Sequence, residues 1–167
     1  MAEDDRHFTH STLRERIVEH VFVGDVLRTL WRRGVTDVEI LRPEFDAHGY
    51  DVVMSRGPVV RHVQLKTQAE GKVSVGRALA EKPSGCVIWI GLSRETLELG
   101  PFLWFGGAPG LPLPDISMYP NPRRATHNKE GVRPVRKNHH ELPSAAFTKL
   151  KTLDEVVVRL FGELPGG

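Results

Sequence analysis

The fold is decided by two neighbouring stretches, FDAHGYDVVM at residues 45–54 and VVRHVQLKT at residues 59–67. Both have the pattern of strands, and the link SRGP between them carries the Gly-Pro pair typical of a turn. Together they predict an antiparallel β-hairpin. Side chains alternate across a strand, so Gln64 and Lys66 share one face, and the hairpin brings Asp51 near Gln64.

These residues could support metal-assisted chemistry on a phosphate. A hard divalent cation binds oxygen ligands, and the hairpin offers the Asp51 carboxylate, the Gln64 amide oxygen and the Leu65 backbone carbonyl. Lys66 can orient a water molecule or stabilise negative charge that develops on a phosphodiester. One acid from the helix upstream would complete the set. The alternative is that Gln64 and Lys66 form the solvent face of an amphipathic edge strand.

Length and composition indicate one soluble domain. The chain has 167 residues, of which 40% are hydrophobic and 26% charged, so we expect a single unit over 1–167 with a sizeable core. No apolar run is long enough to span a bilayer, and the acidic start MAEDDR lacks the apolar region of a signal peptide. A cytoplasmic location is the default expectation. The single cysteine, Cys86, lies in an apolar run and is expected to be a buried thiol.

The rest of the chain predicts helices and strands around the hairpin. Apolar spacing predicts a long helix at about 11–33, with Ser11 or Thr12 as its cap and Gly34 at its end. The continuous apolar run at 86–91 predicts a strand buried on both faces. Also predicted are strands at 38–41 and 102–105, helices at 73–81 and 153–161, and core positions for Trp31, Trp89 and Trp104. This order predicts an α/β fold with a central mixed sheet flanked by helices.

A Pro- and Gly-rich loop is predicted at about 106–143, and its second half is basic. From residue 119 to residue 140 the only acid is Glu130, and the basic residues there include Arg123, Arg124, Lys129, Arg133, Arg136 and Lys137. Such a cluster is typical of a surface that binds the phosphates of a nucleic acid. The alternative is a mobile loop whose charges only keep it solvated.

The hairpin and the helix before it resemble the PD-(D/E)XK superfamily of restriction-endonuclease-like nucleases. The resemblance rests on Gly-Tyr-Asp at 49–51, Gln-x-Lys at 64–66 and the upstream helix with its acids, and it covers about 15–91. It implies a restriction-endonuclease-like fold, Mg²⁺ or Mn²⁺ as the cofactor, Asp51 and Gln64 as metal ligands, and Lys66 as the catalytic lysine. Two features depart from the superfamily pattern. No proline precedes Asp51, and Gln64 stands where Glu is commoner, which removes one negative charge.

The resemblance also implies a metal-binding acid on the long helix, where Glu15, Glu19 and Asp25 are candidates. Glu19 borders the apolar face, because Phe22 and Val26 follow it at i+3 and i+7. We therefore predict Glu19 as the third ligand. The alternative, that each of these acids is an ordinary solvated helix residue, stays open. Two loop acids, Glu44 and Asp46, are candidates for assisting a second metal ion.

The leading hypothesis is a Mg²⁺-dependent endonuclease that hydrolyses phosphodiester bonds of a nucleic acid, which the resemblance implies is DNA. The basic segment would hold the nucleic-acid backbone. By analogy, such an enzyme would act in bacterial defence or DNA processing, and a homodimer fits a superfamily in which many members cut both strands as dimers. The alternative is a non-catalytic nucleic-acid-binding or protein-interaction module on the same fold. A third hypothesis is a partner-dependent subunit with an exposed apolar patch at 102–105.

Overall fold

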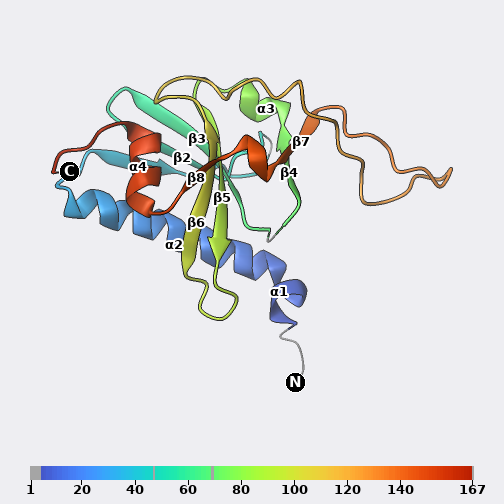
Figure 1. Ribbon diagram of the computed structural model, residues 1–167, viewed down its shortest axis with the longest axis horizontal. Coiled ribbons are helices and arrows are strands. Elements are labelled where there is room, and N and C mark those ends of the chain that lie inside the picture. The colour runs from blue at the N-terminus through green and yellow to red at the C-terminus, as the bar shows by residue number, and fades with distance from the viewer. Residues whose placement is uncertain (1–4, 47, 69, 167) are drawn as a thin grey trace.

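A computed structural model describes residues 5–46, 48–68 and 70–166 of the chain. The acidic residues 1–4, on which the expectation of no signal peptide partly rests, lie outside this range. Figure 1 shows a central β-sheet with the long helix α2 below it and a smaller group of elements at the upper right. The helices are α1 (Arg6–Thr9), α2 (Ser11–Arg32), α3 (Arg77–Ala80), the 3-10 turn η1 (Ser144–Ala146) and α4 (Leu153–Phe161).

The main sheet has six strands in the order β1-β2-β3-β5-β6-β8. They are β1 (Val38–Leu41), β2 (Val52–Arg56), β3 (Val59–Lys66), β5 (Gly85–Leu92), β6 (Leu99–Gly106) and β8 (Thr148–Leu150). A second sheet pairs β4 (Lys72–Gly76) with β7 (His139–Pro143). The predicted hairpin is confirmed, because β2 and β3 pair antiparallel with Val52 opposite Val63. Since β3 and β5 pair in parallel, the sheet is mixed, and the predicted α/β architecture is confirmed.

Strand β5 separates two hydrophobic cores. Ile88 and Ile90 face the core that the sheet shares with α2 and α4, whereas Val87 and Trp89 face the core beneath β4 and β7. The prediction of a strand buried on both faces is therefore confirmed, and Cys86 is a buried free thiol as expected. The same alternation places Val63 of β3 in the first core, which turns its neighbouring side chains toward the other side of the sheet.

Helix α2 ends as the sequence predicts. Gly34 has a φ of 71°, its amide donates to the Trp31 carbonyl at 3.0 Å, and the Val35 amide donates to the Leu30 carbonyl at 2.9 Å. The predicted cap at the other end is wrong. His10 occupies the cap position, and no side-chain oxygen of a described residue caps the helix, because α1 leads almost directly into α2.

Arg61 joins the hairpin to α4 from within the core. Its side chain is fully buried, and its guanidinium donates to the backbone carbonyls of Leu160, Arg159 and Gly107, each at 2.9 Å. Two of these carbonyls belong to the last turn of α4, where carbonyl groups lack partners within the helix and the helix dipole is negative. This contact fixes the position of β3 relative to the end of α4.

Residues 73–81 do not form the predicted helix. Val73 and Val75 lie in β4, opposite Leu142 and His140 of β7, and only residues 77–80 are helical. β-branched residues in alternation bury one face of a strand well, and this tertiary pairing overrides the apparent helical spacing. The loop predicted at about 106–143 ends at residue 138 for the same reason, because β7 supplies the partner of β4.

Two predictions about aromatic residues are also wrong. Trp31 is 73% exposed, because it lies on the face of α2 opposite to the buried Phe22, Val26 and Leu30. The segment 102–105 shows no exposed apolar patch, since Phe102, Trp104 and Phe105 are all buried. Trp89 and Trp104 are buried as predicted. None of the helices described for this chain is long and apolar enough to cross a membrane.

Candidate metal centre

Asp51 is tied to the strand that carries Gln64. Gly49 turns the chain toward Asp51 with a φ of 72°, a value that favours glycine. The Asp51 amide then donates to the Val63 carbonyl at 2.9 Å. Oδ2 of the Asp51 side chain accepts a hydrogen bond from the Leu65 amide at 2.7 Å, which leaves Oδ1 without a hydrogen bond from the strand. The carboxylate is therefore oriented by the backbone on both sides of Gln64.

All four residues predicted to form the site line one cleft of about 430 Å³. Asp51 stands before β2, Gln64 and Lys66 come from the end of β3, and Glu19 comes from α2. The cleft adjoins a second hollow of about 750 Å³ that shares Asp46, Gln64 and Lys66 with it. Basic side chains from α3, from the end of the long loop and from the start of β7 also line the second hollow, namely Arg77, Arg136 and His139. Acidic and basic groups thus face one continuous depression.

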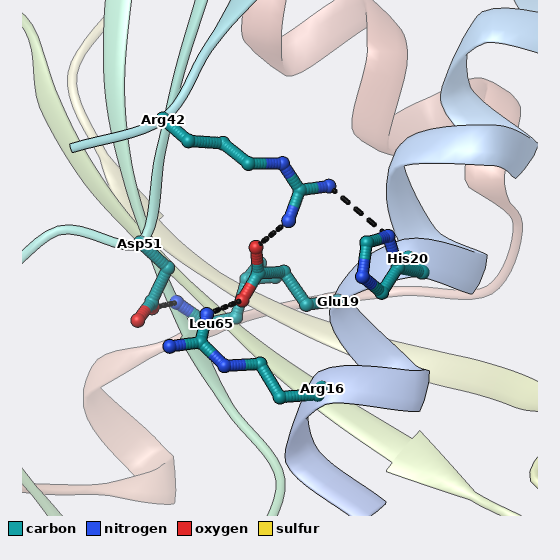
Figure 2. Close-up of polar contacts among 6 residues, drawn as sticks. All are labelled: Arg16, Glu19, His20, Arg42, Asp51 and Leu65. Carbon is teal, nitrogen blue, oxygen red and sulfur yellow. Dashed lines mark hydrogen bonds and ion pairs between the residues drawn. The ribbon is translucent and has the colours of Figure 1, made fainter. Parts of the chain in front are cut away.

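Glu19 is buried at the edge of the core, as its position on the helix predicts. It is 6% exposed, and both carboxylate oxygens are occupied. Arg16 donates to Oε2 at 3.0 Å, and Arg42, just after β1, donates to Oε1. Figure 2 shows the Glu19 carboxylate extending from α2 between these two guanidinium groups, toward the side where Asp51 meets the Leu65 amide.

The other two helix acids differ from Glu19 in their surroundings. Glu15 is exposed and lines the cleft, close enough for its charge to act on Lys66. Asp25 forms an ion pair with Arg28 on the same helix and lines a separate hollow. Of the three candidates, only Glu19 is both buried and close enough for its charge to act on Asp51.

Asp51 and Lys66, the two ionisable side chains that the hairpin contributes to the cleft, are both held in conditions that disfavour their charges. Burial raises the pKa of the Asp51 carboxyl; the Leu65 amide opposes this shift, and the negative charge of Glu19 adds to it. Burial lowers the pKa of the Lys66 ammonium; Asp51 opposes that shift, and the positive charge of Arg136 adds to it. A cation bound beside Asp51 and an anion bound beside Lys66 would relieve both costs. Such perturbed pairs are common at functional sites.

The donor set fits a hard divalent cation. Oε1 of Gln64 is buried and has no hydrogen-bond partner among the residues that the structure describes, which is costly for an amide oxygen. Together with the carboxylates of Asp51 and Glu19 it offers the oxygen ligands that Mg²⁺ and Mn²⁺ accept. Within the described part of the chain, no group of three or more His, Cys, Asp or Glu side chains is arranged to hold a metal. Any ion here would therefore depend on the glutamine.

The basic residues predicted to bind nucleic acid fall into two places. Arg123, Arg124, Lys129 and Arg133 are exposed along the segment that extends away from the body in Figure 1, drawn in orange. This segment, which we call the arm (residues 122–136), folds back on itself: Arg123 and Val135 form an antiparallel bridge, and the Arg136 amide donates to the Pro122 carbonyl at 2.7 Å. Arg136 itself lines the second hollow, and Lys137 is exposed beside it.

His62 packs against Tyr50, with the ring centroids 5.0 Å apart in an edge-on arrangement. Burial lowers the pKa of its imidazole, and the charge of Lys82 lowers it further. This contact agrees with the interpretation that His62 covers the sheet surface.

Sequence reasoning missed Arg16, Arg42 and Arg77. Arg42 lies 23 positions from Glu19, so their contact depends on how β1 packs against α2. No local pattern around Arg42 indicates such a partner. The Arg16 contact could have been predicted from the sequence, since ion pairs at i,i+3 are common on helices.

No protein-family model and no curated protein sequence matches this chain. Four chains among the solved structures match it. One is the 1.6 Å structure of Archaeoglobus fulgidus Hjc, a Holliday junction resolvase from an archaeal hyperthermophile. The match is 14% identical, has a TM-score of 0.44, and covers 83% of this chain and 98% of that chain. These values are too low to show the family or to bear on function, so the function proposed below rests on the cleft.

Proposed function

We propose that this protein is a Mg²⁺- or Mn²⁺-dependent nuclease that hydrolyses phosphodiester bonds, with DNA as its substrate. The observation that carries the proposal is Oε1 of Gln64, which finds no partner in the described part of the chain and shares one cleft with Asp51, Glu19 and the half-buried Lys66. The choice of DNA follows the resemblance to restriction-endonuclease-like nucleases. A role in defence or DNA processing remains a prediction by analogy with that superfamily, and a cytoplasmic location remains the default prediction from the sequence.

Each side chain of the cleft has a part in this chemistry. Asp51, Gln64 and Glu19 would hold the cation, and a bound Mg²⁺ would supply positive charge beside the scissile phosphate. Lys66 lies two residues after Gln64 on the same face of β3, so its ammonium can donate hydrogen bonds to the attacking water or to a phosphate oxygen. Because burial lowers its pKa, Lys66 also gives up a proton more readily than an exposed lysine.

The basic groups outside the cleft support a nucleic-acid substrate. Arg77 and Arg136 line the second hollow, next to Lys66, and the arm carries further arginine and lysine side chains away from it. A phosphate backbone that enters at the cleft would meet the positive charges of Arg77 and Arg136 on its way to the arm. We propose that the arm holds the strand whose phosphodiester lies in the cleft.

The test is cleavage of a labelled duplex, the corresponding single strand and an RNA of the same sequence, with Mg²⁺ or Mn²⁺ present. Lys66→Ala and Asp51→Ala should each lower the cleavage rate by about 10²–10³-fold, the usual cost of removing a group that stabilises charge in the transition state. Lys72→Ala is the matched control, because Lys72 is exposed and does not line the cleft.

Two outcomes would count against the proposal. The first is the absence of cleavage of every substrate with either metal. The second is metal-dependent cleavage that Lys66→Ala and Asp51→Ala leave at the rate of the control variant, since such activity would come from another site or another protein.

The second candidate function is a non-catalytic nucleic-acid-binding module. It is favoured by Glu19, whose two oxygens are already occupied by arginines, and by the neutral Gln64 in place of a carboxylate. This function predicts salt-dependent binding that persists in chelator and in Asp51→Ala. Binding that requires the metal, or is lost in Asp51→Ala, would exclude it.

We also propose that the chain forms a homodimer through the exposed side of α2. Leu13 and Trp31 are 59% and 73% exposed, and Ile17 and Leu27 lie between them on the same face. The four positions are symmetric about residue 22. Two antiparallel copies of α2 would therefore place Leu13 against Trp31 of a second copy and Ile17 against its Leu27, which is the self-complementary arrangement that a two-fold axis requires.

A further inference from the structure

The carboxylate of Glu19 is paired with two cations, although its side chain is only 8% exposed. Arg16 donates to Oε2 from the preceding turn of α2, and Arg42 donates to Oε1 from the end of β1 (Figure 2). Every other oxygen of the predicted ligand set is less engaged. Asp51 accepts one backbone hydrogen bond through Oδ2, and Oε1 of Gln64 accepts none from any residue described. Glu19 is thus the ligand whose release decides whether the set can close on a cation.

A metal ion and the two guanidinium groups compete for the two oxygens of one carboxylate. Each oxygen has a second lone pair, but a divalent cation that used it would lie beside a guanidinium of the same charge sign. A carboxylate that ligates a cation must turn at least one oxygen toward it, and both oxygens of Glu19 face arginine. Breaking one of these contacts without replacement would leave a charged group poorly compensated in a mostly buried position. Cation binding to this cleft therefore carries a cost that another anion could offset.

The arginines are placed to receive such an anion. The side chains of Arg16 and Arg42 are 69% and 35% exposed, so both reach solvent beside the cleft that Arg16 helps to line. A guanidinium forms charge-assisted, often bidentate hydrogen bonds with phosphate as readily as with carboxylate. A nucleic-acid phosphate that enters the cleft would thus offer each arginine a new partner of the same charge as Glu19.

We propose that Arg16 and Arg42 form a releasable clamp on Glu19 that couples cation binding to phosphate binding. This inference rests on the proposed function. Without nucleic acid the clamp holds Glu19, and the cation is bound weakly by Asp51 and Gln64. When a phosphate backbone binds, the arginines move to it and Glu19 turns to the cation. Arg16 and Arg42 are in this account positioning residues that act through Glu19.

The coupling must be reciprocal, because it is a property of two binding equilibria. In a protein whose clamp is intact, nucleic acid should tighten Mn²⁺ binding at the cleft by a factor within the usual range of about 5–150. Arg42→Ala and Arg16→Ala should bind Mn²⁺ more tightly than the parent protein in the absence of nucleic acid. Both should show a smaller enhancement when nucleic acid is added, because part of the competition is already gone.

The experiment is calorimetric titration of Mn²⁺ into the full chain, with and without a saturating duplex oligonucleotide. All proteins carry Lys66→Ala so that the duplex stays intact, and the set comprises this parent, Arg42→Ala, Arg16→Ala and Arg28→Ala. Arg28 is the matched control, since it pairs with an acid of α2, Asp25, at the same i,i+3 spacing but outside the cleft. Asp51→Asn in the same background shows whether Mn²⁺ binds at the cleft.

Thermal unfolding checks that each variant is folded. If Arg42→Ala does not fold, Arg16→Ala, the more exposed position, carries the test.

Tighter Mn²⁺ binding in the clamp variants with a reduced effect of the duplex, and no change in Arg28→Ala, supports the proposal. Equal Mn²⁺ affinity in parent, clamp and control variants overturns it, as does a duplex effect that the clamp variants leave unchanged. In either of those cases loss of binding in Asp51→Asn would show that the metal site of the proposed function stands. Absence of Mn²⁺ binding in every protein, with and without duplex, overturns the clamp and the metal-dependent nuclease together.

Discussion

At the residue scale, the cleft depends on a few groups whose charge or polarity is not balanced within the protein. Gln64 has a buried oxygen without a partner within residues 5–46, 48–68 and 70–166, and burial disfavours the charged forms of Asp51 and Lys66. Natural proteins keep such costly arrangements mainly where binding or catalysis needs them. Replacing one of these residues should therefore change the free energy of unfolding by a measurable amount.

Asp51→Asn should stabilise the protein in chelator at pH 7. The folded-state pKa of Asp51 is raised above its ordinary value of 3.8, so ionisation costs stability at higher pH, and the asparagine removes that cost while its side-chain oxygen still accepts from the Leu65 amide. The advantage should shrink as the pH falls through the raised pKa and vanish below 3.8, where the carboxyl is protonated in both states. Thermal unfolding across the acidic and neutral pH range measures it.

The metal provides the control for this variant. Mn²⁺ should raise the melting temperature of the wild-type protein and leave that of Asp51→Asn nearly unchanged, because ligand binding stabilises only the state that binds. An Asp51→Asn variant that is less stable than wild type in chelator at pH 7 would contradict the stability cost assigned to the half-buried carboxylate.

The sequence predicts those parts of the site whose contacts join residues that are close together in the chain. Gln64 and Lys66 share a face because strands alternate, and Asp51 lies beside them because a short turn joins the two strands, so both placements follow from neighbouring residues. The Arg42 contact with Glu19 joins β1 to α2, and the approach of Arg136 to Lys66 joins the loop to β3. No periodic pattern in the sequence indicates either contact, because each depends on packing between elements that are distant in the chain.

At the element scale, a helix or strand is predicted correctly from the sequence where one of its faces is buried along its whole length. Helix α4 has a buried face and a complete capping box, in which Thr152 and Glu155 exchange side-chain and backbone hydrogen bonds, and its bounds match the prediction. The segment 73–81 fails because its two valines pair with β7, which comes much later in the chain.

Thr152→Ala should lower the free energy of unfolding by about 0.5–2 kcal/mol, because it removes the side-chain acceptor of the Glu155 amide at the start of α4. Urea unfolding measures the change. Thr148→Ala is the control, since Thr148 is exposed on β8 and caps no helix. An equal, small effect of both substitutions would show that the capping box does not stabilise α4.

The arm should bind nucleic acid without supporting the fold. Joining Arg123 to Val135 through Asn-Gly would keep the bridge at the base of the arm and the bond from Arg136 to Pro122, while removing Arg124, Lys129 and Arg133. The slope of log K against log salt should become shallower by up to about 0.9 for each phosphate that the shortened arm no longer neutralises. The melting temperature should stay the same.

Fluorescence anisotropy with a labelled duplex at several salt concentrations gives the slope. Arg32→Ala, at the far end of α2, is the charge control. An unchanged slope in the shortened arm would mean that its charges only solvate the loop.

At the scale of the whole molecule, the sheet, α2 and the β4–β7 layer enclose one depression that combines acidic and basic groups. Figure 1 shows the arm extending from the body beside β7, and α2 crossing the lower part of the molecule. The exposed face of α2 lies opposite the buried face that packs against the sheet. A dimer formed through the exposed face would therefore leave the hairpin of each copy uncovered.

Trp31→Glu should convert the dimer to a monomer, because it places a charge at the apolar contact with Leu13 of the second copy. Sedimentation equilibrium at micromolar concentration measures the mass, and Arg32→Glu, an exposed neighbour outside the four apolar positions, is the control. A wild-type protein that sediments as a monomer would exclude this interface.

The most direct test of the metal centre is a crystal structure of the protein soaked in Mn²⁺ and measured at a wavelength that reveals manganese. The ion is predicted to lie between the Asp51 carboxylate and Oε1 of Gln64, with both within coordination distance. An anomalous peak elsewhere, or none in the cleft at millimolar Mn²⁺, would contradict the assignment.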